Sequence, residues 1–194
     1  KVFVTGSHAN NTGLQCGAWT QGWQGSLENI PGATSIQAGF DEVAQGARVD
    51  TEKDAGTIVY VIGEVPYAEW FGDYRGDNFN NKIITKKERT DMSFNSTDSD
   101  IAQIKEWQKA GHKVAVVFIT GRPLPITSLI NAADAFVVAW LPGSEGAGVA
   151  DVLFGKVKPT GKLPHTWPKD AKQIPINVGD GKKGLYPYGF GLTY

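Results

Sequence analysis

The stretch TIVYVI at residues 57–62, followed by Gly63 and Glu64, decides the fold. It is short, rich in β-branched residues and apolar throughout, which is typical of a strand that is buried on both faces of a parallel sheet. Similar apolar runs lie at residues 2–5, 114–119 and 135–141. We therefore expect these runs to form the parallel strands of one sheet.

Segments with helical periodicity lie between the apolar runs. Helices are expected at residues 34–43, where Thr34 or Ser35 can act as the cap, at 99–111, at 128–133 and at 144–154. Strands that alternate with helices predict an α/β fold, here an open three-layer sandwich with a mostly parallel sheet of about six strands and helices on both faces. The length of 194 residues fits one domain, which we expect to span residues 1–194.

The charge and the cysteine content exclude several functional classes. Lys and Arg number 19 against 20 Asp and Glu, so no general positive field attracts nucleic acid or an anionic membrane. The single cysteine, Cys16, excludes an internal disulfide and a cysteine-rich zinc site. No apolar run reaches the roughly 18 residues of a membrane-spanning helix. The chain begins without the features of a signal peptide, as an interior piece of a protein would.

The chain combines six tryptophans with 24 glycines. Aromatic rings on glycine-rich loops are a common means of holding sugars, because the C–H faces of a sugar stack on indole. Ligands of open parallel sheets bind at the carboxyl ends of the strands, where the long segments 6–30 and 63–97 contain Trp19, Trp23 and Trp70. We expect these loops to bind a ligand. The alternative is that Trp19 or Trp23 closes the top of the core.

The segment 63–73 places carboxylates among aromatic residues directly after a strand. Glu69 lies beside Tyr67 and Trp70, and burial against such rings would disfavour its charged form and suit it to donate a proton. Glu64 lies at the strand end, where a carboxylate more often accepts hydrogen bonds and organises the loop. The alternative for the whole segment is an ion-paired surface loop.

Other polar groups near the strand ends indicate supporting roles. Arg122 can pin a loop carboxylate or bind a sugar hydroxyl, and the first is the expected role. His8 has no partner at ligand spacing, which favours a hydrogen-bonded loop residue over a metal ligand or a base. The glycines at 143, 146 and 148 do not have the spacing of a dinucleotide fingerprint. We therefore expect neither a cofactor nor a metal.

Taken together, the motifs resemble the second, C-terminal domain of glycoside hydrolase family 3, the β-glucosidases and exo-β-glucanases, and most closely its plant and bacterial β-glucan exohydrolase branch. The resemblance covers nearly the whole chain. It rests on VTGSHAN at 4–10, QCG at 15–17 with Trp19 and Trp23, VIGE at 61–64, PYAE at 66–69, TGRP at 120–123, AWLPGSEG at 139–146, TGKLP at 160–164, NVGD at 177–180 and YGFGL at 188–192.

This resemblance implies a retaining, exo-acting β-glucosidase or β-glucanase, in which an N-terminal barrel domain supplies an aspartate nucleophile and this domain supplies the acid/base glutamate. The glutamate of the family's Pro-Tyr-x-Glu stretch falls on Glu69, and a tryptophan that grips the leaving sugar falls on Trp23. The other site candidates are Trp19 and Trp70 for substrate binding and Glu64 and Arg122 for support. The resemblance also implies a β-glucan or β-glucoside substrate, a secreted or periplasmic location, and no activity for this chain without the barrel.

Two other functional classes stay open at this point. One is a non-catalytic carbohydrate-binding domain that uses the tryptophan-rich loops alone. The other is a flavodoxin-like domain that binds a small ligand or a nucleotide.

Overall fold

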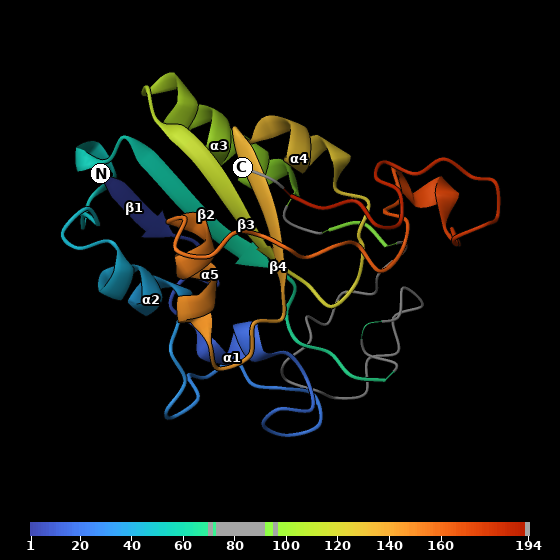
Figure 1. The fold of residues 1–194 in the computed structure, drawn as a ribbon, viewed down its shortest axis with the longest axis horizontal. Coiled ribbons are helices and arrows are strands. Elements are labelled where there is room, and N and C mark those ends of the chain that lie inside the picture. Colours follow the sequence, from blue (N-terminus) through green and yellow to red (C-terminus); the bar gives the residue numbers. More distant parts are fainter. Residues whose placement is uncertain (70–71, 73–91, 95–96, 193–194) are drawn as a thin grey trace.

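A sheet of four parallel strands forms the centre of the molecule, and the strands lie side by side in the order of the chain (Figure 1). The structure is a computed structural model that describes residues 1–69, 72, 92–94 and 97–192. The strands are β1 (Val2–Thr5), β2 (Thr57–Gly63), β3 (Lys113–Ile119) and β4 (Ala135–Trp140). The predicted parallel sheet is confirmed, and each strand lies within one residue of its predicted bounds.

The expectation of about six strands is wrong for the described residues, which contain four. Beyond β4 and the helix that follows it, residues 155–192 form loops, the short 3₁₀ helix η2 (Ala171–Gln173) and one isolated antiparallel bridge between Trp167 and Tyr186. Prolines and glycines recur in this segment. They interrupt the ladder of hydrogen bonds that a further strand would need.

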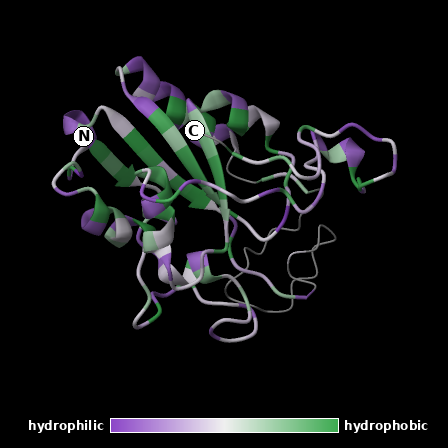
Figure 2. Cartoon of the chain, in the orientation of Figure 1, coloured by the Kyte–Doolittle hydropathy of each residue, from purple (hydrophilic) through white to green (hydrophobic). Residues whose placement is uncertain are grey.

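Helices cover both faces of the sheet (Figure 1), as predicted. The helices α2 (Ile36–Val43) and α5 (Gly146–Leu153) pack on one face, and α3 (Thr97–Lys109) and α4 (Thr127–Ala132) pack on the other. In β2, Val59 and Val61 belong to the core between the sheet and α2, while Ile58 and Ile62 belong to the core between the sheet and α3. The strands are mostly apolar, as Figure 2 shows, which fits the burial of β2 and β3 between the two layers of helices.

The helix starts differ in part from the predicted ones, and a side-chain cap is present at α2. Ser35 caps α2, since its hydroxyl accepts the main-chain N–H of Ala38 at 3.1 Å. The helix α3 begins before the predicted residue 99. The helix α5 begins after the predicted residue 144, because residues 142–145 form a turn closed by the N–H of Glu145 and the carbonyl of Pro142. None of the described helices has both the length and the apolar character that crossing a membrane requires.

Three short elements of the described residues were not predicted from the sequence, η2 among them. The helix α1 (Thr12–Cys16) lies inside the long loop after β1, and the side chain of Asn11 caps it by accepting the N–H of Leu14 at 2.9 Å. The 3₁₀ helix η1 (Glu52–Asp54) precedes β2. The helix α1 is a little over one turn long, too short to show a periodic pattern of apolar residues.

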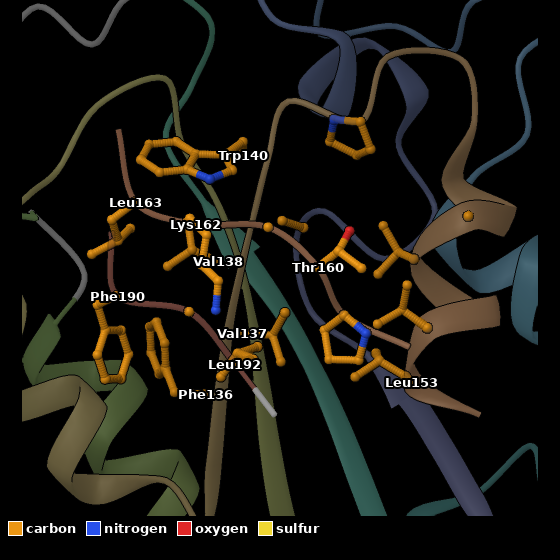
Figure 3. Close-up of a pocket in the computed structure, with 18 of the residues that line it drawn as sticks. Phe136, Val137, Val138, Trp140, Leu153, Thr160, Lys162, Leu163, Phe190 and Leu192 are labelled. Carbon is orange, nitrogen blue, oxygen red and sulfur yellow. The ribbon is translucent and has the colours of Figure 1, made fainter. Parts of the chain in front are cut away.

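An apolar groove of about 540 Å³ lies beside β4, the last strand of the described sheet (Figure 3). Its walls come from β4, from α5 and from the segments around residues 157–163 and 186–192, and they include Phe136, Leu163 and Leu192. Neither Glu69 nor Arg122 lines this groove. It is therefore separate from the loops that carry the predicted site.

Candidate active site

The predicted site residues lie in loops that follow the carboxyl ends of three adjacent strands. Trp19 and Trp23 follow β1, Glu64 and Glu69 follow β2, and Arg122 follows β3. Because the strands are parallel, these ends meet at one edge of the sheet. The structure therefore brings together five of the six site candidates; the sixth, Trp70, lies outside the described residues.

Gly6 allows the loop after β1 to cross close over β2. Its φ is +111°, in the region that side chains rarely adopt, and a Cβ at this position would lie 2.2 Å from the carbonyl oxygen of Val61. The same carbonyl accepts the main-chain N–H of His8 at 3.1 Å. Gly6 thus lets the loop that contains Trp19 and Trp23 start directly against β2, the strand that precedes Glu69.

Glu64 is the centre of a buried hydrogen-bond network. Its Oε1 accepts from Nη2 of Arg122 at 2.7 Å and from Nε at 3.1 Å, and its Oε2 accepts from the Thr120 hydroxyl at 2.7 Å and the Tyr67 hydroxyl at 3.2 Å. The guanidinium of Arg122 lies over the Tyr67 ring, 4.2 Å from its centroid, and also donates to the carbonyl of Gly72. These contacts of the Glu64 carboxylate join the loops after β2 and β3.

His8 links the loop after β1 to the loop after β2. It is buried, with Nε2 3.0 Å from the main-chain oxygen of Glu64 and Nδ1 2.9 Å from the Ser7 hydroxyl. Burial lowers the pKa of His8, so the ring is neutral near pH 7. Among the residues that the structure describes, no group of three His, Cys, Asp or Glu side chains is arranged to hold a metal ion.

Glu69 is exposed and lies between two indole N–H groups. Nε1 of Trp23 donates to Oε2 at 2.5 Å, and Nε1 of Trp19 donates to Oε1 at 3.2 Å. The hydrogen bond from Trp23 is the main cause that lowers the pKa of Glu69; a main-chain bond and the weaker contact from Trp19 act in the same direction. In this domain the carboxyl group is therefore stabilised as an anion.

This finding corrects the physical argument made from the sequence. Burial against neighbouring rings was expected to disfavour the charge on Glu69, but the carboxylate is exposed. Tyr67, the one neighbouring aromatic residue among those described, turns instead toward Glu64 and Arg122. The residues that contact Glu69 come from the other loop, 46 and 50 positions away in the sequence, which a local reading of residues 63–73 could not show.

Trp19 and Trp23 are exposed rather than packed in the core. The exposed fraction is 69% for Trp19 and 41% for Trp23, so neither ring closes the top of the core. Trp19 has a φ of +61°, which is uncommon for a residue with a side chain, and its main-chain N–H donates to the carbonyl of Trp23 at 3.2 Å. This closed loop directs both indole N–H groups at one carboxylate.

The sequence did not indicate the contacts of three residues that organise the site. Thr120 and Tyr67 both donate to Glu64, and Gln24 accepts the main-chain N–H of Ala68 at 2.8 Å through its Oε1. Thr120 immediately follows β3, so the strand-end rule could have found it. Gln24 is buried, although glutamine is mostly exposed in proteins, and nothing in its sequence context marks it.

Comparison with known proteins places this chain in a family. The glycosyl hydrolase family 3 C-terminal domain matches residues 1–194. A periplasmic beta-glucosidase of Salmonella typhimurium is 31% identical over 82% of this chain, and a lysosomal beta glucosidase of Dictyostelium discoideum is 27% identical over all of it. The chain spans 21% and 26% of the lengths of these two relatives.

Solved structures show the same fold over the whole chain. An exo-1,3/1,4-beta-glucanase from a Pseudoalteromonas species superposes with a TM-score of 0.83 at 36% identity, and this chain covers 25% of that protein. A beta-glucosidase from Listeria innocua superposes with a TM-score of 0.73 at 21% identity, which supports the fold alone. The chain belongs to the glycosyl hydrolase family 3 C-terminal domain family, whose relatives include β-glucosidases and an exo-1,3/1,4-β-glucanase.

Proposed function

We propose that this domain supplies the acid/base residue, Glu69, and the stacking surface for the leaving sugar to a retaining, exo-acting enzyme that releases glucose from β-glucans or β-glucosides. The observation that carries the proposal is the position of the Glu69 carboxylate. It is exposed at the carboxyl edge of the sheet and accepts hydrogen bonds from two exposed tryptophans. A proton donor must be reachable by the glycosidic oxygen, and the well-bonded Glu64 is not free for that task.

In the proposed mechanism, Glu69 protonates the glycosidic oxygen while an aspartate of a barrel domain attacks the anomeric carbon. Glu69 then removes a proton from the water that releases glucose with retained configuration. Retention requires the two carboxyl groups to lie about 5–5.5 Å apart. The barrel, which we place in the part of the protein outside residues 1–194, would bring its carboxylate to Glu69 and cover it.

Covering the site also supplies the pKa change that acid catalysis needs. In the domain by itself, hydrogen bonds hold the pKa of Glu69 low. A nearby second carboxylate and the exclusion of water both disfavour the charged form and raise the pKa. We therefore place the proton-donating state of Glu69 in the assembled site, with sugar bound.

Trp23 and Trp19 fit the stacking role because indole faces bind the apolar face of a sugar. Their N–H groups are occupied by Glu69, so substrate binding and acid positioning share the same two side chains. The exposed rings also favour a second candidate function, a carbohydrate-binding domain without chemistry. A secreted or periplasmic location is part of the proposal, supported by the relative in Salmonella that is named periplasmic.

The substitution Glu69→Ala in the intact two-domain protein separates these functions. Removing a general acid costs roughly 10²–10⁴-fold in rate where the leaving group needs a proton. We expect a loss of this size in kcat/KM for a natural disaccharide, and a much smaller loss for an aryl glucoside with an acidic phenol. Equal activity of the variant and the parent on the disaccharide would leave only the binding function.

A further inference from the structure

The loop that contains Trp19 and Trp23 (the tryptophan loop) and the loop that contains Glu69 (the Glu69 loop) lie against each other and make three successive contacts. Trp23 donates its indole N–H to Glu69, Gln24 accepts the main-chain N–H of Ala68 at 2.8 Å, and Gly25 lies against Pro66. A Cβ on Gly25 would be 2.6 Å from Cβ of Pro66, so the glycine is what permits this approach. These contacts fix the position of the two loops relative to each other.

Gln24 makes the more sheltered of the two hydrogen bonds in this series, which is partly buried. Its exposed fraction is 6%, whereas the bond between Trp23 and Glu69 lies in solvent. Water competes with an exposed hydrogen bond more than with a sheltered one, because breaking the bond to a buried side chain leaves its polar atom unpaired. The bond from Ala68 to Gln24 is therefore the contact that can hold the backbone next to Glu69 in place.

The amide nitrogen of Gln24 indicates that this side chain has a role beyond stability. Its Nε2 is buried and has no hydrogen-bond partner among the described residues. A buried unpaired donor costs free energy, so an apolar side chain of the same size would avoid this cost. What an apolar side chain could not provide is the acceptor oxygen for Ala68.

We propose that Gln24 is a positioning residue for the acid/base step: its carbonyl oxygen holds the main chain at Ala68, and so holds the Glu69 carboxyl against Trp23 and within reach of the glycosidic oxygen. This inference rests on the proposed function of Glu69. Gln24 does not touch substrate in this account; it acts through the backbone of the adjacent residue.

The experiment compares four variants in the intact two-domain protein: Gln24→Met, Gln24→Asn, Gln24→Glu and Gln15→Met. Met removes the acceptor at similar length, Asn is one methylene too short to reach Ala68, and Glu keeps an acceptor oxygen. Gln15 is the matched control. It is a fully buried glutamine of the same loop with one unpartnered amide atom, and its Nε2 donates to the carbonyls of Thr34 and Gly143 rather than toward Glu69.

The readout is the ratio of kcat/KM for a β-linked glucose disaccharide to kcat/KM for an aryl glucoside with an acidic phenol. This ratio divides out the concentration of folded enzyme, so partial unfolding of a variant does not change it. A displaced catalytic group costs up to about 10²-fold in rate. We expect Gln24→Met and Gln24→Asn to lower the ratio by roughly tenfold or more, Gln24→Glu to restore most of it, and Gln15→Met to leave it at the parent value.

The inference is overturned if Gln24→Met and Gln24→Asn keep the parent ratio, or if Gln15→Met lowers it as much as they do. Glu69→Ala, measured in parallel, distinguishes a failure of the role of Gln24 from a failure of the proposed function of Glu69. If Glu69→Ala lowers the ratio and the Gln24 variants do not, only the role of Gln24 is wrong. If Glu69→Ala leaves the ratio unchanged, the proposed function fails and the role of Gln24 fails with it.

Discussion

At the scale of single residues, the carboxyl group of Glu69 is prepared by hydrogen bonding rather than by burial. Two indole N–H groups stabilise its charged form, whereas a general acid works from its neutral form. The same donors suit the second half of the proposed mechanism, in which the carboxylate must act as a base. In the proposed mechanism, the barrel domain and the bound sugar would determine when Glu69 carries its proton.

The substitution Trp23→Phe keeps an aromatic ring and removes the stronger N–H donor. Because the donor stabilises the anion, its loss raises the pKa of Glu69. The alkaline limb of the kcat/KM profile of the two-domain protein, where the acid loses its proton, should therefore move to higher pH.

Trp19→Phe is the matched control for this measurement. Its indole contact with Glu69 is longer, 3.2 Å against 2.5 Å, and contributes less to the lowered pKa. We therefore expect a smaller shift of the alkaline limb. A downward shift in Trp23→Phe, or an equal shift in both variants, would contradict the assigned hydrogen bonding.

At the scale of elements, the strands were predictable and the site was predictable only in part. The runs in β2 and β3 are apolar on both faces of the sheet, so their type and position follow from hydrophobicity alone. The placement of Glu69 between Trp19 and Trp23 depends on how two loops pack, and no local pattern encodes such a contact. The site residues were chosen by their resemblance to family motifs. The local chemistry of residues 63–73 predicted that Glu69 is buried against aromatic rings, and this was wrong.

The crossing of α2 and α5 depends on the small size of Gly39. A Cβ at Gly39 would lie 2.5 Å from the Cα of Ala147, and backbone atoms cannot move aside as a flexible side chain can. We expect Gly39→Ala to lower the free energy of unfolding by about 1–3 kcal/mol, measured by denaturant titration.

Gly148 provides the control for the helix crossing, because it lies in α5 with open space around its Cβ position. Gly148→Ala should be neutral or should stabilise the protein by up to about 1 kcal/mol through helix propensity. If both variants lose the same stability, the cost does not come from the contact between α2 and α5.

At the scale of the whole molecule, the proposed catalytic pair is divided between two domains. Residues 1–194 hold the proposed acid and the tryptophans at an open edge of the sheet, and the chain spans about a quarter of the relatives' lengths. We expect the isolated chain to show no hydrolysis even of activated aryl glucosides, because these still need the nucleophile. Turnover by the purified chain at a rate above that of a Glu69→Ala preparation would show that a nucleophile lies within it.

Azide rescue of Glu69→Ala in the two-domain protein tests the central claim, that Glu69 is the acid/base residue, most directly. With an activated aryl glucoside the glycosyl-enzyme intermediate still forms, but no base remains to activate water. Azide is a small anion that needs no base, so we expect faster turnover with added azide and β-glucosyl azide as the product. No acceleration by azide, or α-glucosyl azide as the product, would contradict the assignment of Glu69.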